Sequence, residues 1–307
     1  MQSHFLQSEA WEKFQNFEGK TTYRLEDKDF SLLAIEDHTP LGNYLFIPYG
    51  PTLASQAGLK SALAAAKKLA VAKKCLFIRL EPTIPIDKSI LKELKLQKTK
   101  DIDPKYTLIL DLDPSEDTLL SNMEQRKRRY YKTYEKKGIS IRTSHDPADA
   151  KILTSLLSTL AENNHFQKHS DKYLTDQINF DFSTLYIAEF EGKPIAAALV
   201  YDDDTTRYYA HAATDYEHRN LAAGAILVVK MIMDAKALGL KYYDFWGITI
   251  SEDPKDPWYG FTRYKKTFGG YQKSYGGTYD YVINHTKYNL YTALRPINRL
   301  KRKILHK

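Results

Sequence analysis

The alternation of hydrophobic and polar positions predicts one order of elements, which occurs twice along the chain. In the first half, residues 22–26, 30–37 and 43–50 alternate or run apolar between turn residues, as strands do. Residues 50–74 are rich in alanine and place apolar residues at helical spacing, and residues 75–82 form an apolar run that ends at a proline. This half therefore predicts three strands, a helix and a closing strand.

The second half repeats this order. Residues 185–203 predict a hairpin, and residues 206–214 predict the next strand. A strongly apolar helix is expected over residues 220–240, with Gly239 at its C-terminal cap, and residues 241–248 form the closing strand. The repeated order predicts a mixed α/β fold of duplicated domains, in which antiparallel-biased sheets are covered by helices.

A basic segment connects the two halves. Residues 113–138 predict a single amphipathic helix that begins near Ser115 and ends at Gly138. Its cations are Arg126, Lys127, Arg128, Arg129, Lys132, Lys136 and Lys137. Such a run forms either a solvated helix face or a surface for a polyanion. Residues 148–166 predict a further helix that packs across the second sheet.

Charge and composition narrow the class of partner. The net charge of +7 favours nucleic acid, phosphorylated metabolites or the anionic membrane face. The basic tail, residues 290–307, fits either such a surface or a docked terminal helix. No apolar stretch is long enough to span a membrane, no signal peptide is visible, and the lone Cys75 fits a reducing compartment. We expect a cytoplasmic protein.

The signatures of metal, nucleotide-loop and covalent catalysis are missing from the sequence. It contains no HExxH, CxxC, GxxxxGK[ST] or GxSxG, and no GxGxxG after a strand. Cys75 lies in an apolar strand, which argues against a reactive thiolate. The chemistry that remains works by positioning and electrostatics, as when an amine attacks an activated ester.

Candidate chemistry gathers near the two closing strands. Each strand carries an acid near its C-terminal end, Glu81 or Asp244, where α/β sheets often bind ligands; the structural alternative is a salt-bridged or solvated acid. Just past the second strand, residues 260–270 (GFTRYKKTFGG) combine cations and aromatic rings in a predicted loop that ends in paired glycines. This loop is either a solvated hairpin or a binding loop.

The predicted sheets also suggest an acetyltransferase that uses acyl-coenzyme A. Such enzymes hold the pyrophosphate with an (Arg/Gln)-x-x-Gly-x-(Gly/Ala) turn at a helix start, but here Arg219 is followed by glycine only at Gly224. An acyl-coenzyme A N-acyltransferase is therefore the less favoured alternative. A non-catalytic tRNA-binding module, supported by charge and aromatic content, is the third.

Several blocks, taken together and in order, resemble the Fem family of aminoacyl-tRNA-dependent peptidyltransferases, which build peptidoglycan interpeptide bridges. They are FLQSEAWEKF, YLFIPYGP, FIRLEP, TLILDL, EKKGISI, YYDFWGI and YKKTFGG, and the resemblance runs from Gln7 to about Asp280. The resemblance implies two acetyltransferase-like domains with a cleft between them, residues 1–105 with 275–307 and residues 106–274. The chain contains no heptad-rich insertion, and in this respect it is similar to the compact members of the family.

The resemblance also implies the reaction and its partners. An amino acid passes from aminoacyl-tRNA to an amine of a stem peptide, carried by lipid II or UDP-MurNAc-pentapeptide. No metal or coenzyme is implied, and a lipid-linked acceptor would bring the protein to the inner membrane face.

The match identifies candidate residues. Lys265 falls on the family's lysine, where an ammonium would stabilise the oxyanion formed from the ester, and Tyr264 replaces the usual phenylalanine before it. Glu81 falls on an acid that would orient or deprotonate the attacking amine. Tyr173 and Tyr209 match tyrosines of the acceptor cleft. The structural alternatives are a surface lysine and plain packing.

Three departures concern the acceptor. Gln15 replaces a phosphate-contacting lysine, His169 replaces an arginine, and His211 replaces a tyrosine. The loss of two cations favours a lipid-linked acceptor or a phosphate site rebuilt from Lys13, Lys168 or His169. Asp244 joins the substrate-binding candidates, and the tRNA-binding candidates are Arg126, Arg128, Arg129, Arg263 and Lys266.

Overall fold

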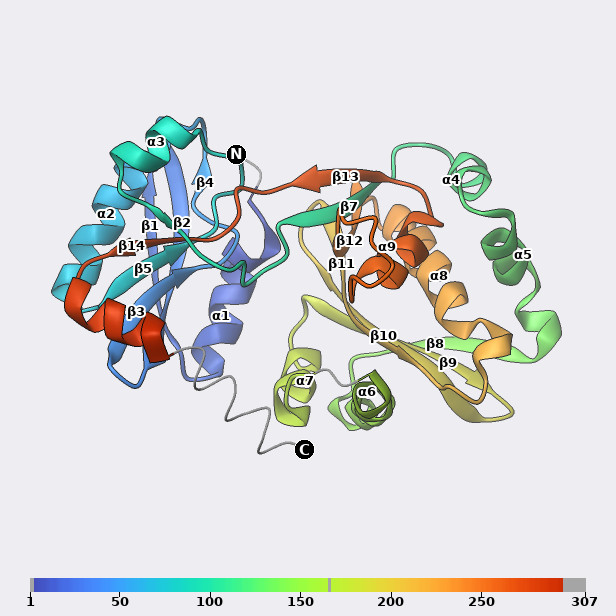
Figure 1. The fold of residues 1–307 in the computed structure, drawn as a ribbon. Coiled ribbons are helices and arrows are strands. Elements are labelled where there is room, and N and C mark those ends of the chain that lie inside the picture. Colours follow the sequence, from blue (N-terminus) through green and yellow to red (C-terminus); the bar gives the residue numbers. More distant parts are fainter. Residues whose placement is uncertain (1–2, 165–166, 295–307) are drawn as a thin grey trace. The chain divides into compact units, whose positions relative to one another are not determined.

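The computed structural model describes residues 3–164 and 167–294. The chain separates into two compact units: residues 1–105 with 274–307 form the first unit, and residues 106–273 form the second (Figure 1). None of the helices formed by the described residues has the length and apolar character needed to span a bilayer.

The first unit is built on a seven-stranded sheet with the order β1-β2-β3-β5-β14-β6, in which β4 pairs with β2. Neighbouring strands are antiparallel except β3 and β5, which are parallel because the intervening chain crosses over through a helix. The strands are β1 (Thr21–Asp27), β2 (Phe30–Thr39), β3 (Gly42–Ile47), β4 (Thr52–Leu53), β5 (Phe77–Leu80), β6 (Gln97–Lys98) and β14 (Tyr279–Val282).

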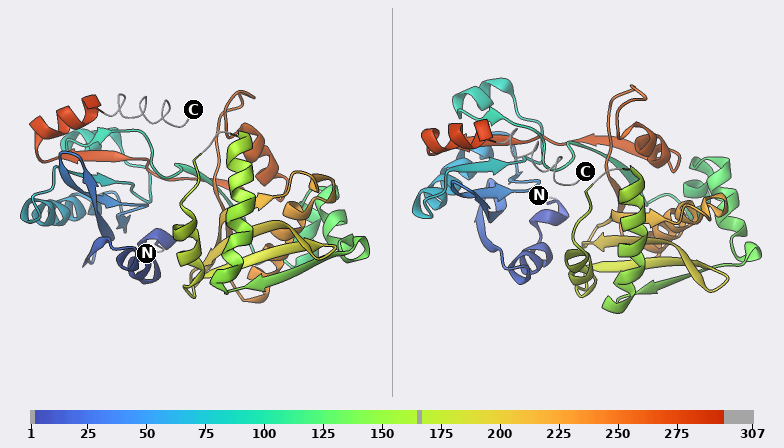
Figure 2. Two further views of the ribbon diagram at one scale, coloured as in Figure 1. Left: turned by 90° about the horizontal axis from the view of Figure 1, so that it is seen from below. Right: turned by 60° about the horizontal axis from the view of Figure 1, so that its bottom comes forward.

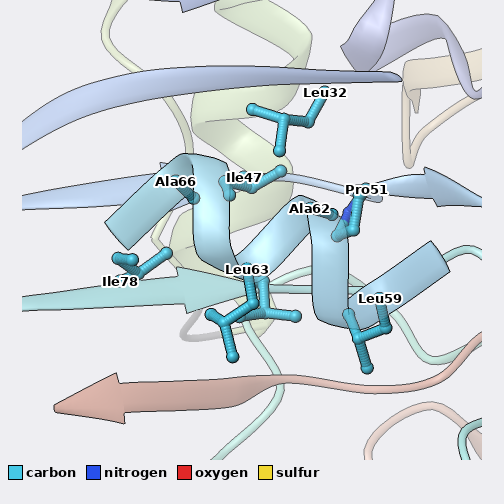
Figure 3. A pocket seen from close by; sticks show the side chains of 9 residues that line it. Leu32, Ile47, Pro51, Leu59, Ala62, Leu63, Ala66 and Ile78 are labelled. Carbon is cyan, nitrogen blue, oxygen red and sulfur yellow. The ribbon is translucent and has the colours of Figure 1, made fainter. Parts of the chain in front are cut away.

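One face of this sheet is covered by the crossover helix α2 (Gly58–Ala72). Apolar residues of α2 recur at helical spacing and pack on buried side chains of β2, β3 and β5. Figure 3 shows this contact, which is lined by apolar side chains and is too narrow for a water molecule. It is a packed core and not a ligand site.

The opposite face of β5 is covered by the helical residues 285–294. Tyr288 and Tyr291 pack on Phe77, which points away from α2. Beside them, Arg79 and Asp280 form a buried bidentate ion pair, with nitrogen–oxygen distances of 2.8 and 2.7 Å. The remaining helices of the unit are α1 (Glu9–Phe17) and α3 (Lys88–Glu93).

The second unit has a seven-stranded sheet with the order β13-β7-β12-β11-β10-β9-β8. Here β11 and β12 are parallel, again across a helical crossover, and the other registers recorded between neighbours are antiparallel. The strands are β7 (Tyr106–Asp111), β8 (Ile139–Ser144), β9 (Ser183–Phe190), β10 (Lys193–Asp202), β11 (Thr206–Thr214), β12 (Tyr242–Gly247) and β13 (Tyr271–Ser274).

Helices cover both faces of the second sheet (Figure 2). The crossover helix α8 (Ala223–Ala237) is apolar on most sides because it lies between the sheet and α5 (Gln125–Thr133). On the other face, α6 (Ala150–Asn164) contacts β10 and β11, and α7 (Asp171–Ile178) contacts β9. The unit also contains α4 (Glu116–Asn122) and α9 (Tyr259–Lys266).

Several predictions from the periodicity are confirmed. Both units have mixed, mainly antiparallel sheets with a helix before the closing strand. The helix expected within residues 148–166 packs across the second sheet over its described part, and residues 165–166 lie outside the described residues. Gly239 follows α8 with φ +80°, a conformation that glycine adopts readily.

Other predictions need correction. The helix expected from residue 50 begins at Gly58, because residues 52–53 form a short strand against β2. The basic helix is broken: α4 ends before the buried, extended Met123, and the Glu124 N–H donates to the Thr267 carbonyl at 2.8 Å before α5 begins. The last part of the basic tail, residues 295–307, lies outside the described residues.

The predicted loop over residues 260–270 is also wrong. Most of it is α9, because Thr262 and Lys265 face the interior one turn apart. The paired glycines lie between this helix and β13, with φ values of +90° and +94°. A Cβ on Gly270 would lie 2.5 Å from the Ile109 carbonyl oxygen, so this close approach requires glycine.

Candidate active site

Lys265 is a buried cation of the second unit. It lies on α9 with 2% of its surface exposed, and its Nζ donates to the Gly247 carbonyl at 2.8 Å. Nζ also lies 3.9 Å from the ring centroid of Phe261, one helical turn earlier, which is 48% exposed. The lysine is therefore held below the surface under an exposed aromatic ring.

Burial changes the protonation of Lys265. Removal from water lowers the pKa of Lys265 to about 7, and the negative charge of Asp244 opposes this shift. An exposed lysine has a pKa near 10.4. Near neutral pH, Lys265 consequently exchanges between ammonium and amine.

Asp244 is the acid that accompanies this lysine. It is 2% exposed on β12 and accepts hydrogen bonds from the Thr107 hydroxyl and, at 2.6 Å, from the Trp246 N–H. Burial raises the pKa of Asp244 to about 6, although both hydrogen bonds and the charge of Lys265 favour the carboxylate. A buried acid and a buried base with shifted pKa values in one place are typical of functional sites.

The backbone of β12 is irregular at this point. Its register with β7 shifts between Asp244 and Gly247, and Trp246 has φ +62°. Residues with a side chain rarely adopt this conformation, and such strain gathers at functional sites.

A second cluster joins three of the predicted acceptor residues. The His169 ring stacks on Tyr173 with 4.8 Å between centroids and meets the His211 ring edge-on at 5.4 Å. His211 Nε2 shares a hydrogen bond of 3.0 Å with the Tyr201 hydroxyl. Burial lowers the pKa of His169, and burial together with the charge of His169 lowers the pKa of His211 to about 3. Both imidazoles are neutral at pH 7.

Tyr209 does not join this cluster. In β11, Tyr209 pairs with Val200 and His211 pairs with Leu199, so that Ala210 forms a bulge. Neighbouring residues of β10 point to opposite faces, and the bulge therefore sends Tyr209 and His211 to opposite faces of the sheet. Tyr209 packs with the α8 core, and burial raises its pKa. The predicted role of Tyr209 in the acceptor cleft stays a prediction.

The tRNA-binding candidates lie on α5 and α9. Arg126 and Arg129 are exposed, whereas Arg128 donates to the Ser121 carbonyl at 2.7 Å. Arg263 and Lys266 are exposed on α9.

The two helices also contact each other. Lys127 of α5 places its Nζ 4.9 Å from the ring centroid of Tyr264 and 5.5 Å from that of Phe268. Tyr264 itself packs on the α8 core, and burial raises its pKa.

Glu81 is buried in the first unit, just after β5. Its Oε1 accepts hydrogen bonds from the Thr278 hydroxyl at 2.5 Å, the Asp103 N–H at 3.1 Å and the Ile102 N–H at 3.3 Å. These donors account for its burial. Asp103 was missed by the sequence analysis: burial and then the charge of Glu81 raise the pKa of Asp103 well above its usual range.

The remaining candidates of the sequence lie on other elements than Lys265. Lys13 is exposed and Gln15 is buried on α1 of the first unit, and Lys168 forms an ion pair with Asp171 in the second. Burial raises the pKa of Cys75 to about 11, which agrees with an unreactive thiol. Within residues 3–164 and 167–294, no group of three His, Cys, Asp or Glu side chains is placed to hold a metal ion.

The structure adds residues that the sequence did not single out: Thr107, Tyr201, Trp246 and Phe261. Thr107 and Trp246 stand inside the blocks TLILDL and YYDFWGI, and Phe261 stands in GFTRYKKTFGG. Their positions in these blocks could have identified these three residues from the sequence, whereas Asp103 lies in no such block.

Comparison with known proteins finds a matching family model and similar proteins. The model of the FemAB family matches residues 179–295, which include Asp244 and Lys265. A lipid II:glycine glycyltransferase of Staphylococcus epidermidis is 23% identical over 81% of this chain and 79% of the relative. The chain is similar to proteins of the Fem family.

Solved structures place the chain in the expected fold class. The crystal structure of FemX matches with a TM-score of 0.81 at 19% identity, over 94% of each chain. A tandem GNAT protein from the clavulanic acid biosynthesis pathway matches with a TM-score of 0.50 at 11% identity, over 83% of this chain and 79% of that one. These likenesses confirm the acetyltransferase-like fold.

Proposed function

We propose that this chain transfers an amino acid from aminoacyl-tRNA to the amine of a peptidoglycan stem peptide. The glycyltransferase relatives support a transferase of peptidoglycan bridge formation, and the match to the FemAB family model agrees with it. The observation that carries the chemical part is the buried Lys265, which is tied to Gly247 and lies close enough to Asp244 for its pKa to respond.

The reaction balances without a further reactant. The amine nitrogen attacks the ester carbonyl carbon, a C–N bond forms, the C–O bond to the ribose breaks, and the amine's proton ends on the ribose hydroxyl. Negative charge develops on the carbonyl oxygen in the transition state. An ammonium has three donors, and Lys265 uses one on the Gly247 carbonyl, so others remain to bind this oxygen.

The two acids serve differently in this proposal. Asp244 favours the charged form of Lys265 and thereby keeps the cation available. Glu81 is the weaker candidate for the base that accepts the amine's proton, because its Oε1 already accepts three hydrogen bonds from its own unit.

The acceptor is proposed to bind at His169, Tyr173 and His211. Two neutral imidazoles and a tyrosine offer stacking and hydrogen bonds, but no positive charge at pH 7. A diphosphate, which both acceptors carry, would gain little there, so this cluster would contact the peptide part of the acceptor. The name of the staphylococcal relative favours the lipid-linked acceptor.

The tRNA is proposed to contact α5 and α9. Arg126, Arg129, Arg263 and Lys266 present exposed cations for the phosphates, and Phe261 presents a ring for stacking. Binding built on such contacts weakens steeply with salt.

Transfer of a radiolabelled amino acid from charged tRNA tests the proposal. Lipid II and UDP-MurNAc-pentapeptide are compared as acceptors, and lipid II is expected to react faster. Lys265→Met is expected to lose about 100-fold in rate, as other donors to an oxyanion do. The matched control is Lys236→Met, because Lys236 also donates to a backbone carbonyl of the second unit, that of Leu112.

Other outcomes would overturn the proposal. Full activity in Lys265→Met removes the role of the lysine. Stabilisation by acetyl-coenzyme A without transfer from tRNA indicates an acyl-coenzyme A enzyme. Salt-dependent tRNA binding with no transfer to either acceptor indicates a binding module.

A further inference from the structure

Trp246 links two groups of residues in the second unit: Asp244 with Lys265, and the aromatic cluster that includes His211. It belongs to β12, at the register shift between Asp244 and Gly247, and its φ of +62° is left-handed. A residue with a Cβ keeps this conformation only where its surroundings impose it. The surroundings of Trp246 therefore call for a physical account.

The backbone around Trp246 contacts both charged groups of the candidate active site. Its N–H donates to Asp244 Oδ1 at 2.6 Å, and the carbonyl of the next residue, Gly247, accepts from Lys265 Nζ at 2.8 Å. Rotation about φ of Trp246 would swing the Gly247 peptide relative to the Trp246 N–H. Both contacts are kept together only while this residue stays left-handed.

The indole ring contacts the other group of residues. It meets the ring of Tyr208 edge-on at 5.8 Å between centroids and that of Tyr201 at 6.2 Å. The Tyr201 hydroxyl shares its hydrogen bond with His211, whose ring meets that of His169. One residue thus contacts the lysine site through its backbone and the histidine cluster through its ring.

We infer that Trp246 is a positioning residue: its ring, packed on Tyr201 and Tyr208, holds the left-handed backbone that fixes Asp244 and directs the Gly247 carbonyl at Lys265. The inference rests on the proposed role of Lys265 in transfer. It adds that the geometry around Lys265 and Asp244 depends on the aromatic cluster that includes His211.

Three substitutions separate this role from simple packing. Trp246→Phe keeps a ring. Trp246→Gly loses the ring but adopts the left-handed conformation at no steric penalty, whereas Trp246→Ala loses the ring and keeps the penalty. If the backbone matters, Gly is better than Ala. If packing alone matters, Gly is no better than Ala, because both remove the whole indole.

The first readout needs no substrate. The pKa of Lys265 is followed by NMR of ¹³C-labelled lysine, with the resonance assigned by its absence from Lys265→Met. The pKa is expected to be unchanged in Trp246→Phe, nearly unchanged in Trp246→Gly and shifted in Trp246→Ala. Because the measurement uses the free protein, its result stands whether or not the proposed transfer reaction is found.

The second readout is the rate of transfer under saturating substrates. Trp246→Phe is expected to stay within about threefold of wild type, Trp246→Gly within about tenfold, and Trp246→Ala is expected to lose roughly 10- to 100-fold in kcat, as misplaced catalytic groups do. The matched control is the pair Glu191→Ala and Glu191→Gly, at a residue with φ +50° in the β9–β10 hairpin, which should leave both readouts unchanged.

Equal effects of Gly and Ala on the pKa of Lys265 and on kcat, or no effect of either, would overturn the inference. If Trp246→Ala does not fold, Trp246→Ser replaces it, because serine also loses the ring and keeps the penalty of the left-handed backbone. A shifted Lys265 pKa in Trp246→Ser with a wild-type pKa in Trp246→Gly supports the positioning role, and equal pKa values in the two variants contradict it. A normal pKa pattern with no transfer by the wild type would leave the inference intact and remove the proposed function.

Discussion

The two units share one arrangement of crossover helix and closing strand, but the buried charges beside the closing strand differ. In each, the closing strand, β5 or β12, lies between a parallel neighbour and an antiparallel one, and follows the crossover helix α2 or α8. Each carries a buried acid at or just after the strand, Glu81 or Asp244. The acids differ in what surrounds them.

The first unit gives hydrogen-bond or ion-pair partners to Glu81, Arg79 and Asp280 near β5, although the pKa of Asp103 beside Glu81 is raised. Glu81 accepts hydrogen bonds from its own loop and from Thr278, and Arg79 meets Asp280 in a bidentate pair to which Tyr288 also donates at 2.8 Å. The registers of β5 with both neighbours run without a shift. Such arrangements serve stability.

The second unit also pairs one buried cation, Arg207 with Asp202, but the buried charges at β12 and α9 have shifted pKa values. Lys265 donates to a carbonyl, and the pKa values of both Lys265 and Asp244 are shifted by burial. β12 breaks its register and strains Trp246 beside them. In the proposed reaction, this difference is the exchange of stability for reactivity that active sites make. This difference can be tested by substitution.

The largest effect is expected from Arg79→Met. This change leaves the Asp280 carboxylate buried at 0% exposure without its partner, which should lower the free energy of unfolding by about 3–5 kcal/mol. Chemical denaturation measures it. A loss below about 1 kcal/mol would contradict the view that this pair is a structural element of the first unit.

Lys265→Met should act in the opposite direction. The folded pKa near 7 is below that of the unfolded lysine, so the unfolded state binds more protons between pH 7 and about 10. The burial of Lys265 therefore destabilises the fold fully below pH 7, and this effect disappears as pH rises. At pH 7, the variant is expected to be about 1–3 kcal/mol more stable than wild type, with the gain shrinking towards pH 10. If Lys265→Met is less stable than wild type at every pH, the view that burial of Lys265 destabilises the second unit is contradicted.

Asp244→Asn should lower the pKa of Lys265. The carboxylate raises that pKa by its charge, and asparagine keeps the shape without the charge. A shift of about one unit or less is expected in the lysine NMR titration, because burial is the larger influence. An unchanged Lys265 pKa in a folded variant would show that the two groups are not coupled.

The smallest effect is expected from Glu81→Gln. The amide oxygen can still accept the N–H groups of Ile102 and Asp103, and the rate of transfer should fall less than tenfold. A general base would lose about 100-fold or more on this change. A loss of that size would indicate that Glu81 is the general base and would contradict the difference drawn between the two units.

The sequence predicts the order of helices and strands well, because hydrophobic periodicity is a local property of the chain. The apolar faces of α2 and α8 and the glycine after α8 follow directly from spacing. The helix α9 was missed because its two buried positions, Thr262 and Lys265, are polar and the paired glycines suggest a loop. The break at Met123 was missed because it depends on a distant carbonyl, that of Thr267.

The candidate site was found only in part. The family resemblance identified Lys265, and the histidines that replace an arginine and a tyrosine do lie together. The bulge at Ala210 separates Tyr209 from them, and a one-residue bulge leaves no mark in a pattern of alternating residues. Trp246 was missed because its conformation, and not its type, gives it a role.

The pH dependence of a single turnover tests the central claim most directly. Transfer from aminoacyl-tRNA to lipid II is measured across pH 5 to 9 in wild type and in Lys265→Met. If the ammonium stabilises the oxyanion, the ratio of the wild-type rate to the variant rate falls as pH rises through about 7, because titration of the attacking amine affects both proteins alike. A ratio that stays constant through this range would contradict the account.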